Sequence, residues 1–314
     1  MNTCSPAVRT DPHTGSKLES FGLGASRLAL GLATLGGAWH PVDEGESLAT
    51  VLHALERGVG VFDAAPAYGT AEQLMGRALR QWRGARPMVS TKVGRLPGLN
   101  AHVDSYDFSP AGMRDSVRRS CDHLGLAQID LLFLHEPQMV PVAQRAEVAA
   151  TLQGLRAEGL VNRLGLAGGH GAGWDGLLET GVFDVVMLFR RLDACIFDGL
   201  REDFPRLRRA GVATYQASPL HMGLLGARHA ELVSKQPEWV WAPQIERAIQ
   251  LRRLAEAHAM ELSVLAHRFA FNLAEFDRVV IGAGNRAQLD AALRDLALGP
   301  LPQDIFEAVC RING

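Results

Sequence analysis

The chain has 314 residues, 47% hydrophobic and 21% charged, which is enough to bury one large core or two modest ones. A formal net charge of −2 at pH 7 gives no electrostatic reason to expect nucleic acid or a membrane as a partner. No apolar stretch approaches the roughly twenty residues of a membrane span. The four cysteines are scattered, without metal-ligand spacing, which predicts free thiols in a reducing cytoplasm and no metal site.

The N-terminal segment differs in composition from the rest of the chain. Residues 1–17 mix Ser, Thr, Pro, Asp and Arg and have no apolar segment like that of a secretion signal, so they predict a disordered tail. Residues 18–314 contain no linker rich in Pro, Gly or Ser, and this predicts one continuous domain.

Within residues 18–314, short apolar runs alternate with longer segments of helical period, which is typical of βα units around a parallel sheet. The predicted strands are Leu28–Ala33, Val59–Asp63, Met88–Lys92, Ile129–His135, Arg163–Ala167, Val182–Leu188, Val212–Ala217 and Arg278–Gly282. The predicted helices are Glu44–Arg57, Ala71–Trp82, Ser109–His123, Val142–Glu158, Trp174–Glu179, Leu200–Ala210, Pro243–Ala259 and Ala287–Leu298. Eight of each predict a single (β/α)8 TIM barrel. A doubly wound sheet is the alternative, but no G-x-G-x-x-G follows the first strand, so a dinucleotide would not bind in the Rossmann manner.

Lysine is rare in this sequence, with three lysines against twenty-nine arginines, and Lys92 ends a predicted buried strand. Desolvating an unpaired ammonium is costly, so Lys92 needs a partner. Asp63 ends the preceding strand, Tyr68 follows in its loop, and His135 ends the next strand. Because the carboxyl ends of barrel strands meet at one mouth, these residues are predicted to form one site.

This set of side chains suits acid–base chemistry at an oxygen atom. An ammonium next to a phenol stabilises the phenolate, which predicts a lowered pKa for Tyr68. Asp63 would hold Lys92 charged and oriented, and His135 would hydrogen-bond an oxygen of a small-molecule substrate. The set can move a proton at an oxygen whose carbon exchanges hydride with a cofactor. A redox-neutral lyase or isomerase, or a nucleotide-sensing protein that uses the same mouth, is the alternative.

Three sequence blocks, in this order and spacing, resemble the aldo-keto reductase family over nearly all of residues 20–298. They are Gly60–Gly69, Ser90–Gly94 and Ile129–Pro137. Two further segments, Tyr106–Ser109 and Ala217–Leu225, are similar to the branch that includes L-galactose, L-fucose and D-threo-aldose dehydrogenases. The resemblance implies an NAD(P)-dependent oxidoreductase of aldehydes, ketones or sugar hemiacetals. By this resemblance Tyr68 is the general acid/base, Lys92 and Asp63 tune it, and His135 orients the substrate.

The resemblance also implies cofactor-binding positions, and several of them depart from the family's pattern. These positions are Gly168, Met187, Ser218, Leu220, Gly223, Gly282, Gly284, Arg286 and Gln288. Where the family holds the nicotinamide carboxamide with an amide pair after strand five and a Gln in strand six, this chain has Ala167–Gly168 and Met187. His170 is a candidate replacement for the missing amides. The family's stacking tyrosine is matched by Ala217, although Tyr215 points to the same side of the strand.

The turn after the last strand bears on the choice of cofactor. Gly284 stands where NADP-preferring members often have lysine, and Ala291–Ala292 stands where they often have Glu-Asn. A missing cation removes a charge-assisted contact to the 2′-phosphate, although Arg286 could supply one. We therefore expect NAD in preference to NADP. After strand six, Arg190–Arg191 could bind an anionic substrate or pair with Asp193.

Overall fold

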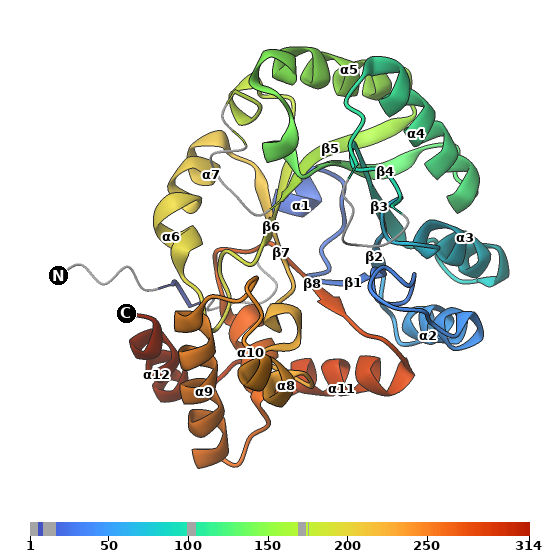
Figure 1. Ribbon diagram of the computed structural model, residues 1–314. Helices are drawn as coiled ribbons and strands as arrows, with labels where there is room; N and C mark the ends of the chain where they lie inside the picture. Colours follow the sequence, from blue (N-terminus) through green and yellow to red (C-terminus); the bar gives the residue numbers. More distant parts are fainter. Residues whose placement is uncertain (1–5, 9–16, 99–104, 169–173, 175) are drawn as a thin grey trace.

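The computed structural model describes residues 6–8, 17–98, 105–168, 174 and 176–314 (Figure 1). At its centre, eight parallel strands pair in chain order into a closed barrel. They are β1 (Leu28–Gly31), β2 (Val61–Asp63), β3 (Met88–Val93), β4 (Ile129–His135), β5 (Val161–Gly168), β6 (Val185–Phe189), β7 (Ala213–Ala217) and β8 (Arg278–Gly282). The predicted (β/α)8 barrel is therefore confirmed.

Helices accompany the barrel strands, and all of them except α1 lie around the outside of the barrel (Figure 1). They are α1 (Lys17–Ser20), α2 (Glu44–Glu56), α3 (Ala71–Gln81), α4 (Pro110–Leu124), α5 (Arg145–Ala157), α6 (Asp198–Glu202), α7 (Phe204–Ala210), α8 (His229–Lys235), α9 (Ala242–Ala257), α10 (Leu262–Asn272), α11 (Arg286–Ala297) and α12 (Gln303–Asn313). Short 3-10 turns are η1 (Pro137–Met139), η2 (Val142–Gln144), η4 (Leu178–Thr180) and η5 (His221–Gly223). Among the described residues, no helix is both long enough and apolar enough to span a membrane.

The helices depart from the sequence prediction in three places. The predicted helix Trp174–Glu179 is wrong, because its described residues form only 3-10 turns, between the left-handed glycines Gly176 and Gly181. The predicted helix Leu200–Ala210 divides into α6 and α7 at Asp203, because Pro205, in the first turn of α7, has no N–H to continue the helical hydrogen bonds from α6. The sequence prediction missed α1, which precedes β1, and α8, α10 and α12, which lie in the long final crossover and at the C-terminus.

Alternation along the strands builds two apolar layers. Leu131 and Phe133 of β4 point into the barrel, whereas Leu132 and Leu134 point outward to the helices. Leu18 of α1 belongs to the inner layer and is fully buried. The barrel is therefore a packed core, and its chemistry is confined to its ends.

A buried arginine fills the end of the barrel where the strands begin. Arg278, the first residue of β8, is 0% exposed. Its guanidinium donates to the backbone carbonyls of Leu23, Gly24 and Ser26 at 2.8–3.0 Å, and to the Tyr215 hydroxyl at 2.5 Å. Burial lowers the pKa of Arg278 and Tyr215 opposes this, while burial raises the pKa of Tyr215 to about 12. The guanidinium thus ties the segment before β1 to β7 and β8.

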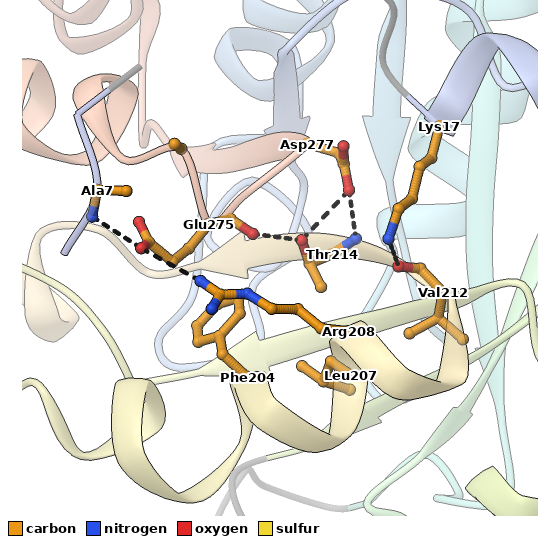
Figure 2. A pocket seen from close by; sticks show the side chains of 10 residues that line it. Ala7, Lys17, Phe204, Leu207, Arg208, Val212, Thr214, Glu275 and Asp277 are labelled. Carbon is orange, nitrogen blue, oxygen red and sulfur yellow. Dashed lines mark hydrogen bonds and ion pairs between the residues drawn. The ribbon is translucent and has the colours of Figure 1, made fainter. Parts of the chain in front are cut away.

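A cavity of about 200 Å³ lies at this same end, next to the start of β7 (Figure 2). Lys17 Nζ donates to the Val212 carbonyl at 3.0 Å, and the Ala7 N–H donates to Glu275 Oε1 at 2.8 Å. Val8 forms a β-bridge with Leu273. The described part of the segment predicted as a tail therefore contacts the barrel, whereas residues 1–5 and 9–16 lie outside the described residues.

We predict that Arg278→Met lowers the free energy of unfolding by about 2–4 kcal/mol, because the buried Leu23 carbonyl and Tyr215 hydroxyl, and the partly buried bonds to Gly24 and Ser26, lose their donor. Urea unfolding followed by circular dichroism measures the change. Arg252→Met is the control: Arg252 lies on the surface of α9 and, within the described structure, pairs with Glu256 at 2.9 Å, so its replacement should change stability by less than about 0.5 kcal/mol. Equal stability of the Arg278→Met variant and the wild type would contradict this account.

Candidate active site

A buried ion pair lies where β2 and β3 end. Lys92 Nζ is 2.5 Å from Asp63 Oδ2 and 3.0 Å from the Ala64 carbonyl oxygen, and Lys92 is 1% exposed. The other oxygen of Asp63 accepts from the Ser90 hydroxyl at 2.7 Å. Asp63 and Ser90 are register partners, so strand pairing itself sets this geometry. A carboxylate and a backbone carbonyl therefore satisfy the lysine expected to need a partner.

Tyr68 and His135 complete the group. The Lys92 ammonium is 4.7 Å from the centroid of the Tyr68 ring, and the Tyr68 and His135 rings meet edge to face at 5.6 Å. Asp63, Lys92 and His135 are buried, whereas Tyr68 is partly exposed at the barrel mouth. The structure thus brings together the four residues that the sequence placed in one site.

Two glycines hold the loop of Tyr68 against the loop that follows β1. A Cβ at Gly36 would lie 2.1 Å from the Tyr68 carbonyl oxygen, and a Cβ at Gly69 would lie 2.1 Å from the Gly36 carbonyl oxygen. The Thr70 N–H donates to that Gly36 oxygen at 2.8 Å. Because only glycine permits this approach, these residues set the position of Tyr68 above Lys92.

The pKa of Tyr68 differs from the sequence prediction. Burial raises it above its ordinary value, and the Lys92 ammonium opposes this shift, as the sequence predicted. The predicted net lowering is wrong, because the sequence does not show how strongly the phenol is desolvated. At neutral pH Tyr68 therefore carries its proton and can give it to a substrate oxygen.

Lys92 is charged, whereas His135 is neutral. Burial lowers the pKa of Lys92, but the Asp63 carboxylate and Tyr68 together raise it above its ordinary value, so the ammonium stays charged. Burial, followed by the Lys92 and Arg95 cations, holds the pKa of His135 well below its ordinary value. His135 is therefore neutral, and its buried Nδ1 has no hydrogen-bond partner within the described structure.

The structure gives the positions of the side chains of β5 to β7 that the sequence analysis considered for the cofactor site. Met187 lies in the inner apolar layer with Ala167. Tyr215 lies on the inner side of β7 with Ala217, as predicted, but its hydroxyl accepts from Arg278 at the opposite end of the barrel, so it does not contact the mouth. His170 lies outside the described residues.

Gln138, which the sequence analysis missed, fills space beside Gly168. A Cβ at Gly168 would lie 2.7 Å from Gln138 Oε1. The Gln138 amide nitrogen donates to Glu136, which fixes the orientation of the amide, and its buried oxygen lacks a partner among the described residues. The sequence did not indicate this contact, because Gln138 and Gly168 are far apart along the chain.

The turn after β8 pairs with α2. Arg286 Nη2 is 2.9 Å from Glu46 Oε2, and Arg286 Nε is 3.2 Å from Oε1 of the same carboxylate. Gln288 Oε1 accepts from the Gly284 N–H at 2.8 Å, while Gly282 faces open space. Glu46 was not predicted as a site residue, because it lies 240 positions before Arg286.

The loop after β7 contains the other three predicted cofactor positions. Ser218 has a φ of +62°, and its hydroxyl accepts from the Met222 N–H at 3.0 Å. Leu220 immediately precedes η5, and Gly223 ends it with a φ of +94°. These three residues therefore lie together on one tightly turned segment at the carboxyl end of β7.

The two arginines after β6 have separate roles in packing. Arg191 is paired with Asp203 at 2.7 Å and with Glu202, which makes it a structural residue, whereas the Asp193 charge acts on Arg190. The Arg190 guanidinium lies 5.2 Å from the ring centroid of Trp239 and donates to the Trp239 carbonyl at 2.7 Å. Neither contact by itself indicates an anionic substrate.

A second cavity lies between the loops that follow β3 and β4, at the same end as Lys92 and His135. Its volume is about 480 Å³. It is lined by Tyr106, Asp107, Phe108, Ser109, Pro110, Met139, Pro141, Gln144 and Glu147. The Tyr106 and Phe108 rings stack at 5.7 Å. Aromatic faces beside carboxylates suit a ligand with both apolar and hydroxyl-bearing faces.

Comparison with known proteins agrees with this arrangement. The chain is 28% identical to the L-galactose dehydrogenase of Arabidopsis thaliana, over 96% of this chain and 92% of that protein. It is 26% identical to the D-threo-aldose 1-dehydrogenase of Pseudomonas sp, over 85% of this chain and 88% of that protein. Its fold is similar to that of an aldo-keto reductase of Bacillus halodurans, with a TM-score of 0.77, 22% identity and coverage of 92% of this chain and 93% of that one. Residues 27–313 match the sequence model of the aldo/keto reductase family, and the chain therefore belongs to this family and is an NAD(P)-dependent oxidoreductase.

Proposed function

We propose that the protein oxidises or reduces the hemiacetal or aldehyde carbon of a sugar, with Tyr68 as the general acid/base and NAD(H) as the preferred cofactor. The observation that carries this proposal is the contact of the Lys92 ammonium with the Tyr68 ring, 4.7 Å away, beside a neutral His135. The similarity to two proteins named as sugar dehydrogenases supports the substrate class. Family membership favours hydride transfer over the redox-neutral alternative.

The proposed chemistry divides among the four residues. A bound nicotinamide supplies or accepts the hydride. Tyr68 Oη gives a proton to the substrate oxygen in reduction and takes one from it in oxidation. Lys92, held by Asp63, stabilises the phenolate that forms in reduction. The neutral imidazole of His135 hydrogen-bonds the same oxygen and orients it.

The residues at the mouth are compatible with a nicotinamide cofactor. The family's amide pair is absent at Ala167–Gly168, but the Gln138 amide occupies the space where a side chain at position 168 would lie. Its buried oxygen has no partner among the described residues and is an acceptor of the kind that a carboxamide NH2 requires. We assign Gln138, together with Gly168 and Met187, to the nicotinamide end of the cofactor site.

The preference for NAD(H) is proposed from the Glu46–Arg286 pair. Arg286 is the cation that the sequence offered for a 2′-phosphate, and Glu46 already engages it through both carboxylate oxygens. Glu46 has a lowered pKa because of Arg286, so it is ionised at neutral pH and would repel a phosphate. The ribose end of the site thus joins Gly282, Gly284 and Gln288 to an acidic side chain.

We predict that Tyr68→Phe lowers kcat by about 10²–10⁴, because the phenol is the proton donor and acceptor, while the Kd for NADH stays within about threefold. Initial rates with a panel of aldoses and both cofactors give kcat, and quenching or enhancement of NADH fluorescence gives Kd. Wild-type turnover of at least one aldose is the positive control. Near-normal turnover by the phenylalanine variant would rule out the assignment.

The pH dependence should follow the raised pKa of Tyr68. Reduction uses the protonated phenol and should stay level through neutral pH, falling only at alkaline pH, whereas oxidation uses the phenolate and should rise with pH. Lys92→Met removes the charge that opposes the raised pKa, so oxidation should begin at still higher pH. The double variant Asp63→Asn/Lys92→Met, which leaves no unpaired buried charge, separates this effect from instability. Superimposable oxidation profiles for the wild type and the double variant would contradict the role of Lys92.

For cofactor choice, we predict that Glu46→Gln shifts the ratio of kcat/KM values for NADP(H) and NAD(H) about tenfold toward NADP(H), because Arg286 becomes available to a 2′-phosphate. The control is Glu44→Gln, on the same helix as Glu46. It breaks an exposed pair with Arg77 of α3 and should leave the ratio unchanged. Gly284→Lys should act in the same direction as Glu46→Gln. A wild-type enzyme that strongly prefers NADP(H) would contradict the proposed role of Glu46.

A further inference from the structure

The loop after β7 holds an unusual backbone. Ser218, His221 and Met222 have φ values of +62°, +49° and +55°, in the left-handed region that non-glycine residues seldom adopt. Such a conformation persists where surrounding contacts dictate it, and it is concentrated at functional sites. The same loop contains Ser218, Leu220 and Gly223, three of the proposed cofactor-binding positions.

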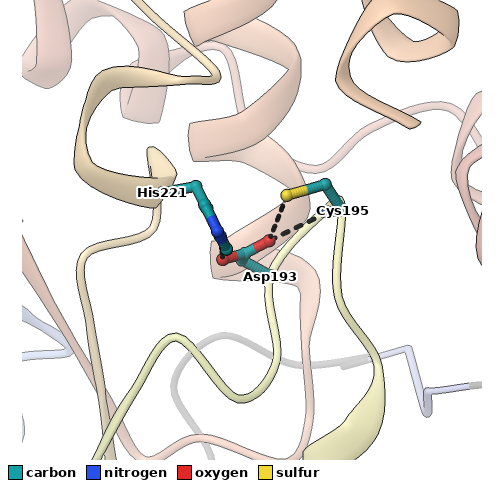
Figure 3. Close-up of side chains that lie close together, drawn as sticks. All are labelled: Asp193, Cys195 and His221. Atoms are coloured by element: carbon teal, nitrogen blue, oxygen red, sulfur yellow. Dashed lines mark hydrogen bonds and ion pairs between the residues drawn. The ribbon is translucent and has the colours of Figure 1, made fainter. Parts of the chain in front are cut away.

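A buried polar cluster anchors this loop to the segment after β6 (Figure 3). Asp193 Oδ2 accepts from His221 Nδ1 at 2.7 Å. The other oxygen, Oδ1, accepts from the Cys195 N–H at 2.9 Å and from its thiol at 3.2 Å. Asp193 is 1% exposed, and His221 and Cys195 are fully buried. Water therefore cannot replace these partners without an opening of the structure.

The second ring nitrogen of His221 reaches a third segment. His221 Nε2 is 3.3 Å from Gln244 Oε1, and this oxygen also accepts from the Trp241 N–H at 3.2 Å, at the start of α9. One imidazole thus connects the loop after β6, the turn η5 and the first turn of α9. The position of η5 is consequently set from both sides of the ring.

The same three side chains contain atoms of the kinds that bind metal ions, but their contacts favour a structural brace. Each potential ligand atom already has a hydrogen-bond partner within the cluster. Burial, and then Asp193, raise the pKa of Cys195 well above its ordinary value, so the sulfur is a thiol and not the thiolate that a metal requires. Among the described residues no fourth His, Cys, Asp or Glu joins these three, so the set lacks the usual closed coordination of a structural zinc ion.

We infer that Asp193 and His221 are positioning residues that hold the strained loop Ser218–Gly223 in the conformation that binds the cofactor. This inference rests on the proposed cofactor role of that loop. Its consequence is specific: weakening the brace lowers cofactor affinity, because the loop must then be ordered by the cofactor itself. The proton-transfer group comes from β2, β3 and β4, so its chemistry is unaffected once the cofactor is bound.

Two substitutions of His221 separate positioning from general packing. Asparagine can place its amide nitrogen where Nδ1 lies, which keeps the bond to Asp193, and it tolerates the left-handed backbone. Glutamine extends toward Nε2 and loses that bond. We expect His221→Gln and Asp193→Asn to raise the Kd for NADH about tenfold, and His221→Asn to stay within about threefold of the wild type. At saturating cofactor, kcat and the KM for the sugar should change less than about threefold, whereas the KM for the cofactor should follow Kd.

The chain contains a matched control for this experiment. His267 Nδ1 is 2.8 Å from Asp295 Oδ2, both residues are buried, and the pair joins α10 to α11 without a hydrogen bond to the loop after β7 among the described residues. His267→Gln should lower Tm to a similar extent as His221→Gln and leave the Kd for NADH unchanged.

NADH fluorescence titration and thermal unfolding of the variants decide the inference. A Kd within twofold of the wild type for both His221→Gln and Asp193→Asn would overturn it, as would a stoichiometric zinc ion in the purified wild-type protein. A cofactor Kd raised equally by His267→Gln would show that general stability, and not positioning, is responsible. Failure of the wild type to bind either NADH or NADPH would instead overturn the proposed cofactor role of the loop, and this inference with it.

Discussion

The ion pair between Lys92 and Asp63 is the interaction on which the active site depends. A buried ammonium is strongly unfavourable unless its charge and its hydrogen-bond donors are satisfied. In this protein a carboxylate and a backbone carbonyl satisfy it from one side, and the pair is set by the register of β2 and β3. The remaining face of the ammonium lies against the Tyr68 ring. The fold thus holds a positive charge where the proposed mechanism forms a phenolate.

Each end of the barrel contains a buried cation, but the partners of the two cations differ. At the opposite end, Arg278 donates to three backbone carbonyls and a phenol, and it binds the polypeptide together. Its partners are fixed main-chain atoms, so its bonds contribute to stability. At the mouth, Lys92 faces a partly exposed tyrosine on a glycine-supported loop, which leaves that tyrosine accessible to a ligand. The contacts that offset the cost of burying a cation therefore stabilise the fold at one end and, in the proposed mechanism, support acid–base chemistry at the other.

The cofactor side of the mouth shows how contacts between distant segments can replace local motifs. The amide beside Gly168 comes from Gln138 after β4, and the acidic side chain beside Arg286 comes from α2. The loop after β7 is tied to the loop after β6 through Asp193 and His221. In each case the contacting residue lies on a different βα unit from the position it supports, because neighbouring loops meet at one rim.

Much of the fold and of the acid–base group was determined by the sequence alone. Alternating apolar strands and amphipathic helices predict a barrel, and parallel strands that all end at one rim bring Asp63, Lys92 and His135 together whatever their loops do. The tertiary structure alone decided the quantities that depend on packing between distant segments. Burial, which no local pattern encodes, reverses the predicted direction of the Tyr68 pKa. Contacts between residues far apart in the sequence pair Arg286 with Glu46 and bond the Tyr215 hydroxyl to Arg278, at the end of the barrel opposite the mouth. A sequence states which side chains are available, whereas desolvation and the choice of partner are properties of the packed chain.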